Sequence, residues 1–463
     1  MSEAKTAALE LGTEDVRKLL FRYAVPAIIA MTASSLYNMV DSIFIGQGVG
    51  PLAISGLALT FPLMNLSAAF GAMVGVGAST LVSMRLGQRD YDTARNVLGN
   101  VTMLNLIIGI LFSAVVLALL DPILYFFGAS DATLRYAREY MEIILLGNVV
   151  THSYLGLNAV LRAAGHPRKS MQATIITVAL NTVLDPIFIF GFGWGIRGAA
   201  IATVLAQIVS LCWQLRLLSD RSELLHFRRG IYRLRRKIVG DILAIGMAPF
   251  LMNVAACIIS ILINRSFKSY GGDLMIGAYG IVNRIAFLFV MIVMGINQGM
   301  QPIAGYNYGA RQYDRVLRVL RLAAIGASAV TCSGFLLGEL APRLAVGLFT
   351  TDEALIGFAV TGMRISYFMF PIIGFQMVST NFFMSLGMAP KAIFLSLSRQ
   401  LLFLLPGLLI LPPLFARYTP WDGSWGVWCA IPAADLLAAL VTLVLLMRQL
   451  RRFRAEAANR INN

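Results

Sequence analysis

Long apolar runs separated by short polar segments constrain this sequence more than any other feature. A helix needs about 20 apolar residues to cross a hydrocarbon core that is roughly 30 Å thick. Twelve runs are long enough, and each is expected to be a helix because lipid leaves exposed backbone polar groups without partners. The predicted fold class is therefore an all-α polytopic membrane protein with twelve transmembrane helices. The runs lie at about 18–46, 56–82, 96–120, 139–161, 170–190, 196–216, 238–264, 277–301, 316–338, 357–384, 392–412 and 425–447.

The distribution of charge agrees with this class. Apolar residues make up 58% of the chain and charged residues 13%, whereas soluble domains are about 25% charged. When residues near the ends of runs are counted with the adjoining loops, both termini and the connections that follow even-numbered runs carry 28 of the 38 Lys and Arg; six lie on the opposite side and four within runs. Basic segments stay in the cytoplasm, so both termini are predicted to be cytoplasmic. The net charge of +15 then needs no nucleic-acid partner, although an anionic-lipid contact is expected at residues 228–237.

The two halves of the sequence repeat each other with a displacement of 222 residues. Each half has an even number of runs, so both enter the membrane from the same side, related by a pseudo-two-fold axis along the membrane normal. The predicted lobes are 1–216 and 238–463, each with six helices, joined by a cytoplasmic linker at 217–237 that is expected to form a surface helix. The matched pairs are Gly87 with Gly309, Arg89 with Arg311, Tyr91 with Tyr313, Asp92 with Asp314, Gly165 with Gly387 and Lys169 with Lys391.

Two carboxylates stand inside runs of the first half, and Lys and Arg occur only near the ends of the runs in this half, away from these acids. An Asp near the middle of a membrane helix costs roughly 2.5–3.5 kcal/mol, so Asp41 and Asp185 need a partner or a role. Tyr37 shares a helix face with Asp41, and Asn181 shares one with Asp185. At about 1.5 Å per residue the two acids reach a similar depth. Either one takes up a proton or a cation sits between them; the alternative is that they only cap or cross-link helices.

Neutral polar residues in the same half complete the predicted coupling site. Asn158 in the fourth run and Thr203 and Gln207 in the sixth are expected to complete a hydrogen-bond network around the acids. No metal is expected beyond Na⁺ at Asp41 and Asp185.

The second half carries basic residues within its runs. Asp435 is predicted either to form a buried bridge with an arginine or to serve substrate binding or gating. The arginines are Arg265, Arg284, Arg364 and Arg399. Apolar and aromatic side chains are candidates for a drug-binding cavity, with plain helix packing as the alternative. The predicted cavity residues are Met31, Ser34, Phe61, Met64, Met73, Gln207, Arg284 and Asp435.

The sequence offers little support for enzyme chemistry. The one GxGxxG, beginning at Gly193, joins two membrane runs and follows no strand, so it does not predict a dinucleotide site. Walker, HExxH and nucleophile-elbow motifs are absent from the sequence, and so is the aspartate-rich motif of membrane-embedded transferases. The four cysteines stand singly and are interpreted as small buried hydrophobes. We expect neither an enzyme nor an organic cofactor. A channel would also fit twelve spans, but the repeat and the acid pair favour alternating access.

Five segments of the sequence resemble the multidrug and toxic compound extrusion (MATE) family, in particular its MepA-like branch. They are YNMVDSIFIGQGVGPLAISGLALTFPL (37–63), RLGQRDYDTARNVLGN (85–100), LRAAGHPRKSM (161–171), LNTVLDPIFIFGFGWGIRGAAIATVLAQ (180–207) and GINQGMQPIAGYNYGARQYDRV (295–316). The resemblance covers about residues 15 to 450. It implies a monomeric antiporter in the prokaryotic plasma membrane that exports amphiphilic, mostly cationic drugs in exchange for H⁺, or alternatively Na⁺.

The resemblance also assigns roles to individual residues. The family's acidic and polar residues on helices 1 and 5 correspond to Asp41, Asn181 and Asp185, while Tyr37, Asn158 and Thr203 match surrounding polar positions. The expected mechanism is that ion binding at Asp41 rearranges the first helix around Pro26 and releases the drug outward. The NorM-like branch has carboxylates on helices 7 and 10 that this sequence lacks, which argues against a cation site in the second lobe. The alternative function is a flippase for lipid-linked precursors, with the second-half arginines holding a phosphate.

Overall fold

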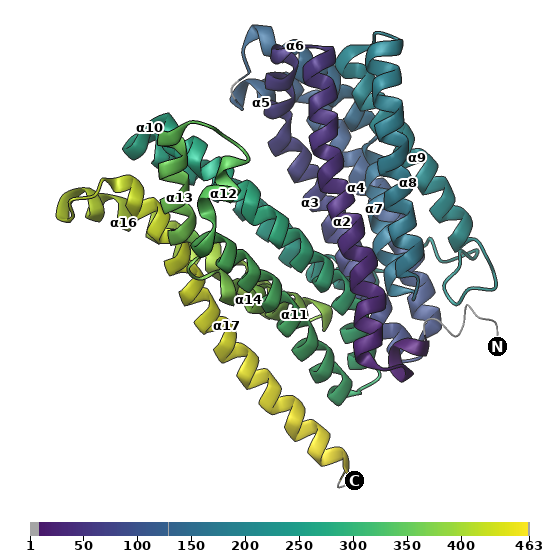
Figure 1. The fold of residues 1–463 in the computed structure, drawn as a ribbon. Coiled ribbons are helices and arrows are strands. Elements are labelled where there is room, and N and C mark those ends of the chain that lie inside the picture. Colours follow the sequence, from purple (N-terminus) through teal and green to yellow (C-terminus); the bar gives the residue numbers. More distant parts are fainter. Residues whose placement is uncertain (1–8, 128, 462–463) are drawn as a thin grey trace. The chain divides into compact units, whose positions relative to one another are not determined.

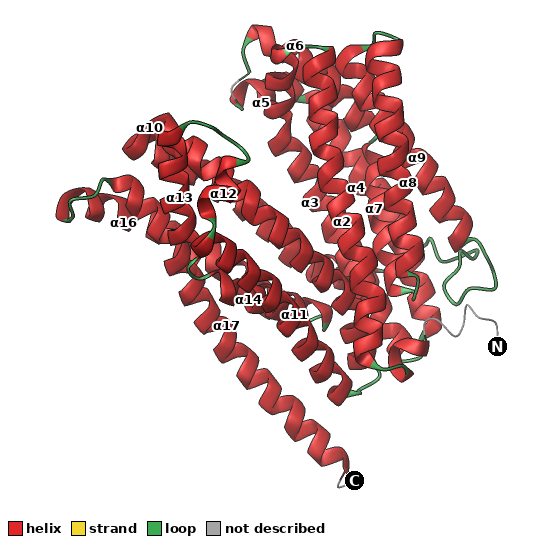
Figure 2. Ribbon diagram, in the orientation of Figure 1, coloured by secondary structure: helices red, strands yellow, loops and turns green. Residues whose placement is uncertain are grey.

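A computed structural model describes residues 9–127 and 129–461, and every regular element in this part of the chain is a helix (Figure 2). In the first half the helices are α2 (Val16–Gly48), α3 (Pro51–Gly87), α4 (Tyr91–Ala118), α5 (Leu120–Phe126), α6 (Asp131–Leu146), α7 (Asn148–Ala163), α8 (Pro167–Pro186) and α9 (Gly195–Leu218). A π-helical turn, η1 (Ile187–Gly191), follows α8. Within this half α8 packs along α9, and α3 packs along α7 (Figure 1).

The second half begins with the longest helix. Its elements are α10 (Arg236–Gly309), α11 (Tyr313–Leu340), α12 (Pro342–Gly347), α13 (Glu353–Tyr367), α14 (Phe370–Ser385), α15 (Ala389–Leu397), the π-helical η2 (Ser398–Leu404), α16 (Leu405–Tyr418) and α17 (Gly423–Ile461). Gly272 interrupts α10 with φ 72° and ψ −166°, a conformation that an L-residue rarely adopts. The glycine therefore divides α10 into two spans, Arg236–Gly272 and Leu274–Gly309.

The described helices account for the predicted spans. Ten are long and apolar enough to cross a membrane, and two bent pairs raise the number to 12 if each pair is one span. The pairs are α6 with α7, bent by 55°, and α13 with α14, bent by 52°. Pro371 at the start of α14 explains the second bend, because proline cannot continue the preceding helix. The predicted all-α class is confirmed, with two spans broken rather than straight.

The backbone repeats with the displacement that the sequence predicts. The helices α4, α5, α6 and α7 begin at residues 91, 120, 131 and 148, and α11, α12, α13 and α14 begin 222 residues later at 313, 342, 353 and 370. Arg89 and Arg311 are the two non-glycine residues of the described chain with positive φ, at 60° and 57°. Because L-residues avoid this conformation, its occurrence at both equivalent positions shows that the two halves share a local fold.

The chain forms two compact units, and two helices are divided between them. One contains Ile29–Phe250 and the other contains Asp15–Ile28 with Leu251–Asn463. The boundaries therefore fall inside α2 and α10, each within two residues of a proline, Pro26 or Pro249. The lobe limits predicted from the sequence, at 216 and 238, stay a prediction.

Each unit contains close helix crossings built on glycines. In the first unit, Gly77 of α3 meets the backbone of Ile242, and Gly246 of α10 meets the backbone of Met73. In the second, Gly295 and Gly299 of α10 meet Ile28 and Ala24 of α2. A Cβ at these glycines would overlap the neighbouring helix, so small residues permit the approach, as is common in membranes.

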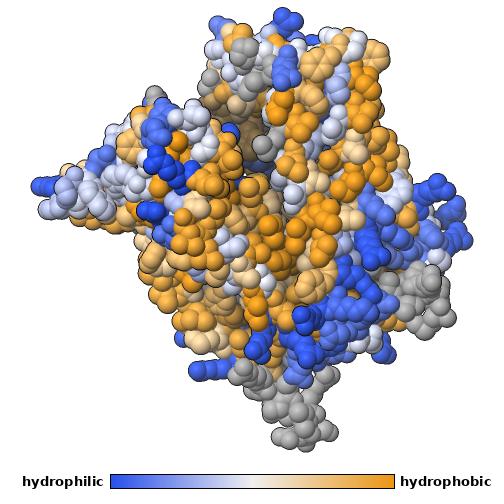
Figure 3. All heavy atoms as spheres, in the orientation of Figure 1, coloured by the Kyte–Doolittle hydropathy of each residue, from blue (hydrophilic) through white to orange (hydrophobic). Residues whose placement is uncertain are grey.

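Apolar side chains fill the interior of each unit and cover much of its surface. Tyr140 and Met141 lie in the core of the first unit, while Phe267, Tyr367 and Trp428 lie in that of the second. Figure 3 shows hydrophobic residues over much of the visible helix surface and hydrophilic residues gathered towards helix ends. This pattern is the one expected of helices surrounded by lipid.

Candidate functional site

Helices α2 and α8 bring Asp41 and Asp185 together inside the first unit. The two side chains are 7% and 0% exposed, although aspartate is among the residues least often buried. The two carboxyl groups interact electrostatically, so they form a single interacting pair. The sequence-based prediction that the two acids meet describes this arrangement.

A triangle of hydrogen bonds lies beside the acid pair. Asn181 Nδ2 donates to the hydroxyl of Tyr37 and, at 3.0 Å, to Thr203 Oγ1. The Thr203 hydroxyl donates to the carbonyl of Ala199 at 3.1 Å. The 3.2 Å bond between Tyr37 and Thr203 therefore has the tyrosine as donor. Helices α2, α8 and α9 are thus joined through neutral polar groups of Tyr37, Asn181 and Thr203, three residues of the predicted coupling site.

The site contains buried oxygens that no described residue satisfies. Asp41 Oδ1, Asn181 Oδ1 and both carboxylate oxygens of Asp185 have no hydrogen-bond donor from the described chain. A buried acceptor without a donor costs about 1–3 kcal/mol, and more when it is charged. Two adjacent carboxyl groups lower this cost by sharing a proton or by binding a cation. The described chain has no group of three or more His, Cys, Asp or Glu suited to a metal, so an ion here would also need amide or hydroxyl oxygens.

Tyr140 of α6 is a member of the site that the sequence analysis missed. It is 2% exposed, and its hydroxyl interacts electrostatically with both Asp41 and Asp185. A tyrosine at the start of an apolar run resembles an interfacial aromatic residue, so the residue type did not predict that Tyr140 belongs to the site. The signal that could have found it is its place in the fourth span, which also carries Asn158.

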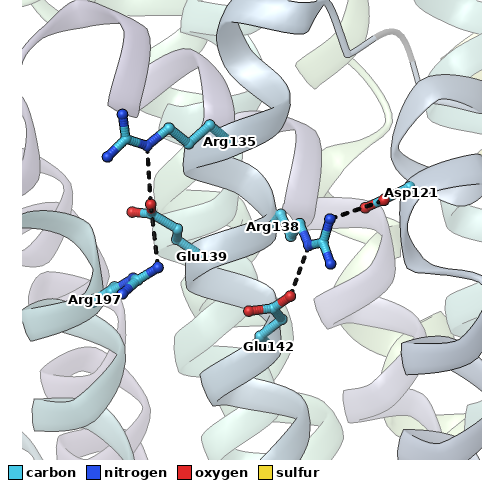
Figure 4. A network of polar contacts seen from close by, with 6 residues as sticks. All are labelled: Asp121, Arg135, Arg138, Glu139, Glu142 and Arg197. Atoms are coloured by element: carbon cyan, nitrogen blue, oxygen red, sulfur yellow. Dashed lines mark hydrogen bonds and ion pairs between the residues drawn. The ribbon is translucent and has the colours of Figure 1, made fainter.

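The residue before Tyr140 belongs to an ion-pair network on the surface (Figure 4). Glu139 accepts from Arg135 Nε at 3.0 Å and from Arg197 Nη2 of α9 at 3.4 Å. Arg138 binds Glu142 at 2.7 Å and Asp121 at 3.1 Å. Exposed pairs of this kind contribute about 0–1 kcal/mol each. Their main consequence is to tie α6 to α5 and α9 next to Tyr140.

Two predicted polar residues make their hydrogen bonds elsewhere in the first unit. Asn158 Nδ2 donates to Thr174 Oγ1 at 3.2 Å, and Thr174 also accepts from Tyr154 at 3.3 Å. Gln207 Oε1 accepts from Thr151 at 2.5 Å. These hydrogen bonds of Asn158 and Gln207 join α7 to α8 and α9 and do not reach the acid pair.

The predicted cavity residues of the first unit lie in different environments. Met73 is buried where α3 crosses α10, so its role there is helix packing. Phe61 is 64% exposed. Met31, Ser34 and Met64 are half-buried, and Met64 accepts a contact from Thr60 at 3.6 Å.

In the second unit Asp435 pairs with Arg399. Arg399 Nε donates to Asp435 Oδ1 at 2.5 Å, and the aspartate is completely buried. Arg265, Arg284 and Arg364 are exposed. The bridge joins η2 to α17 and leaves Arg284 apart from it.

Comparisons with known proteins agree with the repeat and the fold. The family model MatE matches residues 26–187 and again 249–409. Multidrug export protein MepA of Staphylococcus aureus is 27% identical over 438 residues, 94% of each chain. The Staphylococcus haemolyticus protein of the same name is 25% identical over 427 residues, 92% of each chain.

Solved structures of transporters have the same fold. An outward-facing multidrug resistance MATE family transporter of the MOP superfamily superposes with a TM-score of 0.90 at 25% identity, covering 98% of this chain and 99% of the other. A MOP superfamily transporter from Pyrococcus furiosus gives 0.89 at 26% identity, with 98% and 99% covered. These matches define the class as a multi-pass membrane transporter and not an enzyme. The chain belongs to the MatE family of such transporters, because the family model covers most of both halves.

Proposed function

We propose that this protein is a secondary active multidrug exporter that exchanges amphiphilic, mostly cationic drugs for H⁺, with Na⁺ as the alternative coupling ion. Its MepA relatives are named for multidrug export. The observation that carries the ion coupling is the buried pair of Asp41 and Asp185, with oxygens that lack donors in the described chain. Bacterial relatives support a place in the plasma membrane, where the protein works as a monomer with both termini in the cytoplasm.

The coupling follows from the charge of the acid pair. Without a bound ion, two neighbouring carboxylates in a buried place repel each other and attract a cationic drug. A proton or Na⁺ removes one negative charge and satisfies the unpaired oxygens. Drug and ion then compete for the same charge. Coupling requires that the ion bind the outward-facing and inward-facing states with different affinity, since equal affinity shifts no equilibrium.

The helix that carries Asp41 is suited to transmitting the change. The boundary between the compact units falls in α2 between Ile28 and Ile29, two residues after Pro26. Proline removes a backbone donor and weakens the helix at that turn. A rearrangement at Asp41 that strains α2 would therefore bend it near Pro26, which agrees with the mechanism expected from the sequence.

Efflux from proteoliposomes tests the proposal. Proteoliposomes that contain the purified protein are loaded with ethidium or a fluoroquinolone. They are then given a pH gradient and, separately, a sodium gradient at constant membrane potential. Asp41→Asn and Asp185→Asn should each lower ion-driven efflux by about 5–150-fold, the range of ordinary coupling energies. Asp92→Asn, on the surface at 87% side-chain exposure, is the matched control and should transport normally. Undiminished efflux in both acid variants would refute the coupling role.

A further inference from the structure

The segment between α9 and α10 is a fixed surface and not a loose tether. It is the long loop after α9 in Figure 2, and it consists of turns where the sequence predicted a surface helix. Asn100 of α4, completely buried, donates to the carbonyls of Ile231 at 3.4 Å and Arg233 at 3.2 Å. Its Oδ1 accepts from the Arg235 amide at 2.9 Å. These bonds replace those of a helix and hold the backbone of residues 231–235 on α4.

Further contacts fix the earlier part of the same segment. Glu223 binds His166 at 2.7 Å and Lys169 at 3.0 Å. Arg95 Nε donates to the carbonyl of Leu224 at 3.1 Å. Leu224 is 8% exposed and the next residue, also leucine, is 2% exposed. The segment is therefore anchored along its length to the first unit.

The part of the anchored segment that follows Glu223 presents only positive charge. Residues 224–240 contain no Asp or Glu, and all their Lys and Arg side chains are exposed. The six cations are Arg228, Arg229, Arg233, Arg235, Arg236 and Lys237. None of them forms an ion pair with an acidic residue of the described chain. Six like charges held on a rigid backbone favour a ligand of high negative charge.

Two exposed apolar side chains stand among these cations. Tyr232 is 40% exposed and stacks on Phe227, with ring centroids 6.1 Å apart, while Leu234 is 43% exposed. The segment also connects two membrane spans, Gly195–Leu218 and Arg236–Gly272, which places it beside the bilayer surface. Basic residues mixed with an aromatic and an aliphatic side chain at this level are typical of segments that bind acidic phospholipid.

We propose that residues 228–237 form a binding site for the headgroups of anionic phospholipids. Phosphate oxygens bind the arginine guanidiniums through charge-assisted hydrogen bonds. Tyr232 and Leu234 lie against the upper acyl region. The immobility of the segment matters because the cations are already positioned and little conformational entropy is lost on binding. This site is independent of the acid pair and of the transported drug.

Lipid binding to the full-length protein in detergent micelles tests the site. The probes are a fluorescent phosphatidylglycerol and the matched phosphatidylcholine. The wild type should bind phosphatidylglycerol more tightly, and R228Q/R229Q/R233Q should weaken that binding at least about tenfold, since each basic residue near a surface contributes about 1 kcal/mol. The control is R448Q/R451Q/R452Q, which removes three exposed charges from α17 and should leave the affinity within about twofold.

A second variant distinguishes a lipid from a soluble polyanion. Y232S/L234S keeps every charge and should still weaken phosphatidylglycerol binding several-fold, while a short DNA duplex should neither bind tightly nor compete. Equal losses in the two arginine triples would show that only net charge matters and would overturn the proposal. So would equal binding of the two lipids, an unchanged Y232S/L234S, or efficient competition by DNA. Thermal melting of each variant confirms that it is folded.

Discussion

Asn181 in α8 donates a hydrogen bond to the hydroxyl of Tyr37 in α2, and each of these residues stands four positions before an acid. Four residues are about one helical turn, so the bond lies one turn from the carboxyl groups of Asp41 and Asp185. Thr203 of α9 bonds to both partners. A change in the charge of the acid pair therefore acts directly on the point where three helices are joined.

The first prediction concerns this joint, the hydrogen-bonded group of Tyr37, Asn181 and Thr203. Asn181→Leu removes both donors that Asn181 supplies and leaves the Tyr37 hydroxyl with one partner fewer. We expect efflux driven by a pH gradient to fall about tenfold, since a buried polar partner left unsatisfied costs about 1–3 kcal/mol. Asn158→Leu is the control, because its amide bonds to Thr174 and not to the joint. Equal losses of ion dependence in both variants would contradict a special role for Asn181.

The second prediction concerns the crossing of α3 and α10 in the first unit. Gly246→Ala places a methyl group against the backbone of Met73, which cannot move aside as a side chain can. Overpacking of this kind costs about 1–3 kcal/mol, so the variant should melt at a lower temperature. Gly240→Ala lies in the same helix with nothing within 4 Å of the added atom. It should leave stability unchanged or raise it by up to about 1 kcal/mol, and a drop equal to that of Gly246→Ala would refute the packing argument.

Helical periodicity was sufficient to predict the acid pair, because it depends on which residues share a face and on their depth in the span. The same reasoning placed Tyr37 on the helix face of Asp41 and Asn181 on that of Asp185, and the hydrogen bond between them was not predicted. That reasoning did not include Tyr140, which lies in a fourth span that is broken at Gly147 into α6 and α7, with a bend of 55° that no proline in the sequence predicts. Gly147 packs against Val204 of α9, a contact between residues distant in sequence that periodicity does not encode.

The repeat was predictable from the sequence at the level of single residues, and the linker was not. Matched motifs at a constant displacement predicted that the halves are equivalent, and the structure has α4 and α11 begin at the matched pair Tyr91 and Tyr313. The linker was expected to be helical because of its charge and length. Its turns depend on Asn100, which stands over 100 residues earlier and supplies the hydrogen bonds that a helix would otherwise make. Interactions of this kind become visible only in three dimensions.

The third prediction concerns the pH dependence of linker anchoring. The hydrogen bond from His166, with a further one from Lys169, lowers the pKa of Glu223 to about 2. The unfolded value is about 4.3, so the stabilisation is complete above that pH and is lost as pH falls towards 2. The protection of amides 219–235 from hydrogen exchange, taken relative to the intrinsic exchange rate at each pH, should therefore fall between about pH 5 and pH 3.

Two variants check this origin of the pH dependence. In Glu223→Gln, amides 219–235 should be less protected from exchange at pH 7. Their protection should also change less between about pH 5 and pH 3, because the glutamine side chain does not titrate. Glu142→Gln, which changes a surface pair with Arg138 remote from the linker in sequence, should leave the linker's exchange as in the wild type. An unaltered pH response in Glu223→Gln would assign the effect to other groups.

The fourth prediction concerns the two partners of the bridge in the second unit. Arg399→Met leaves Asp435 completely buried, with Oδ2 already lacking a partner in the described chain, and should cost about 3–5 kcal/mol. Asp435→Leu should cost less, because the Arg399 side chain is 33% exposed and can reach water or headgroups. The double variant should recover most of the stability, since replacing a whole buried pair by apolar residues is often neutral. Denaturation of the wild type, the two single variants and the double variant in one detergent completes the double-mutant cycle. Additive losses would mean that Arg399 and Asp435 stabilise the unit independently.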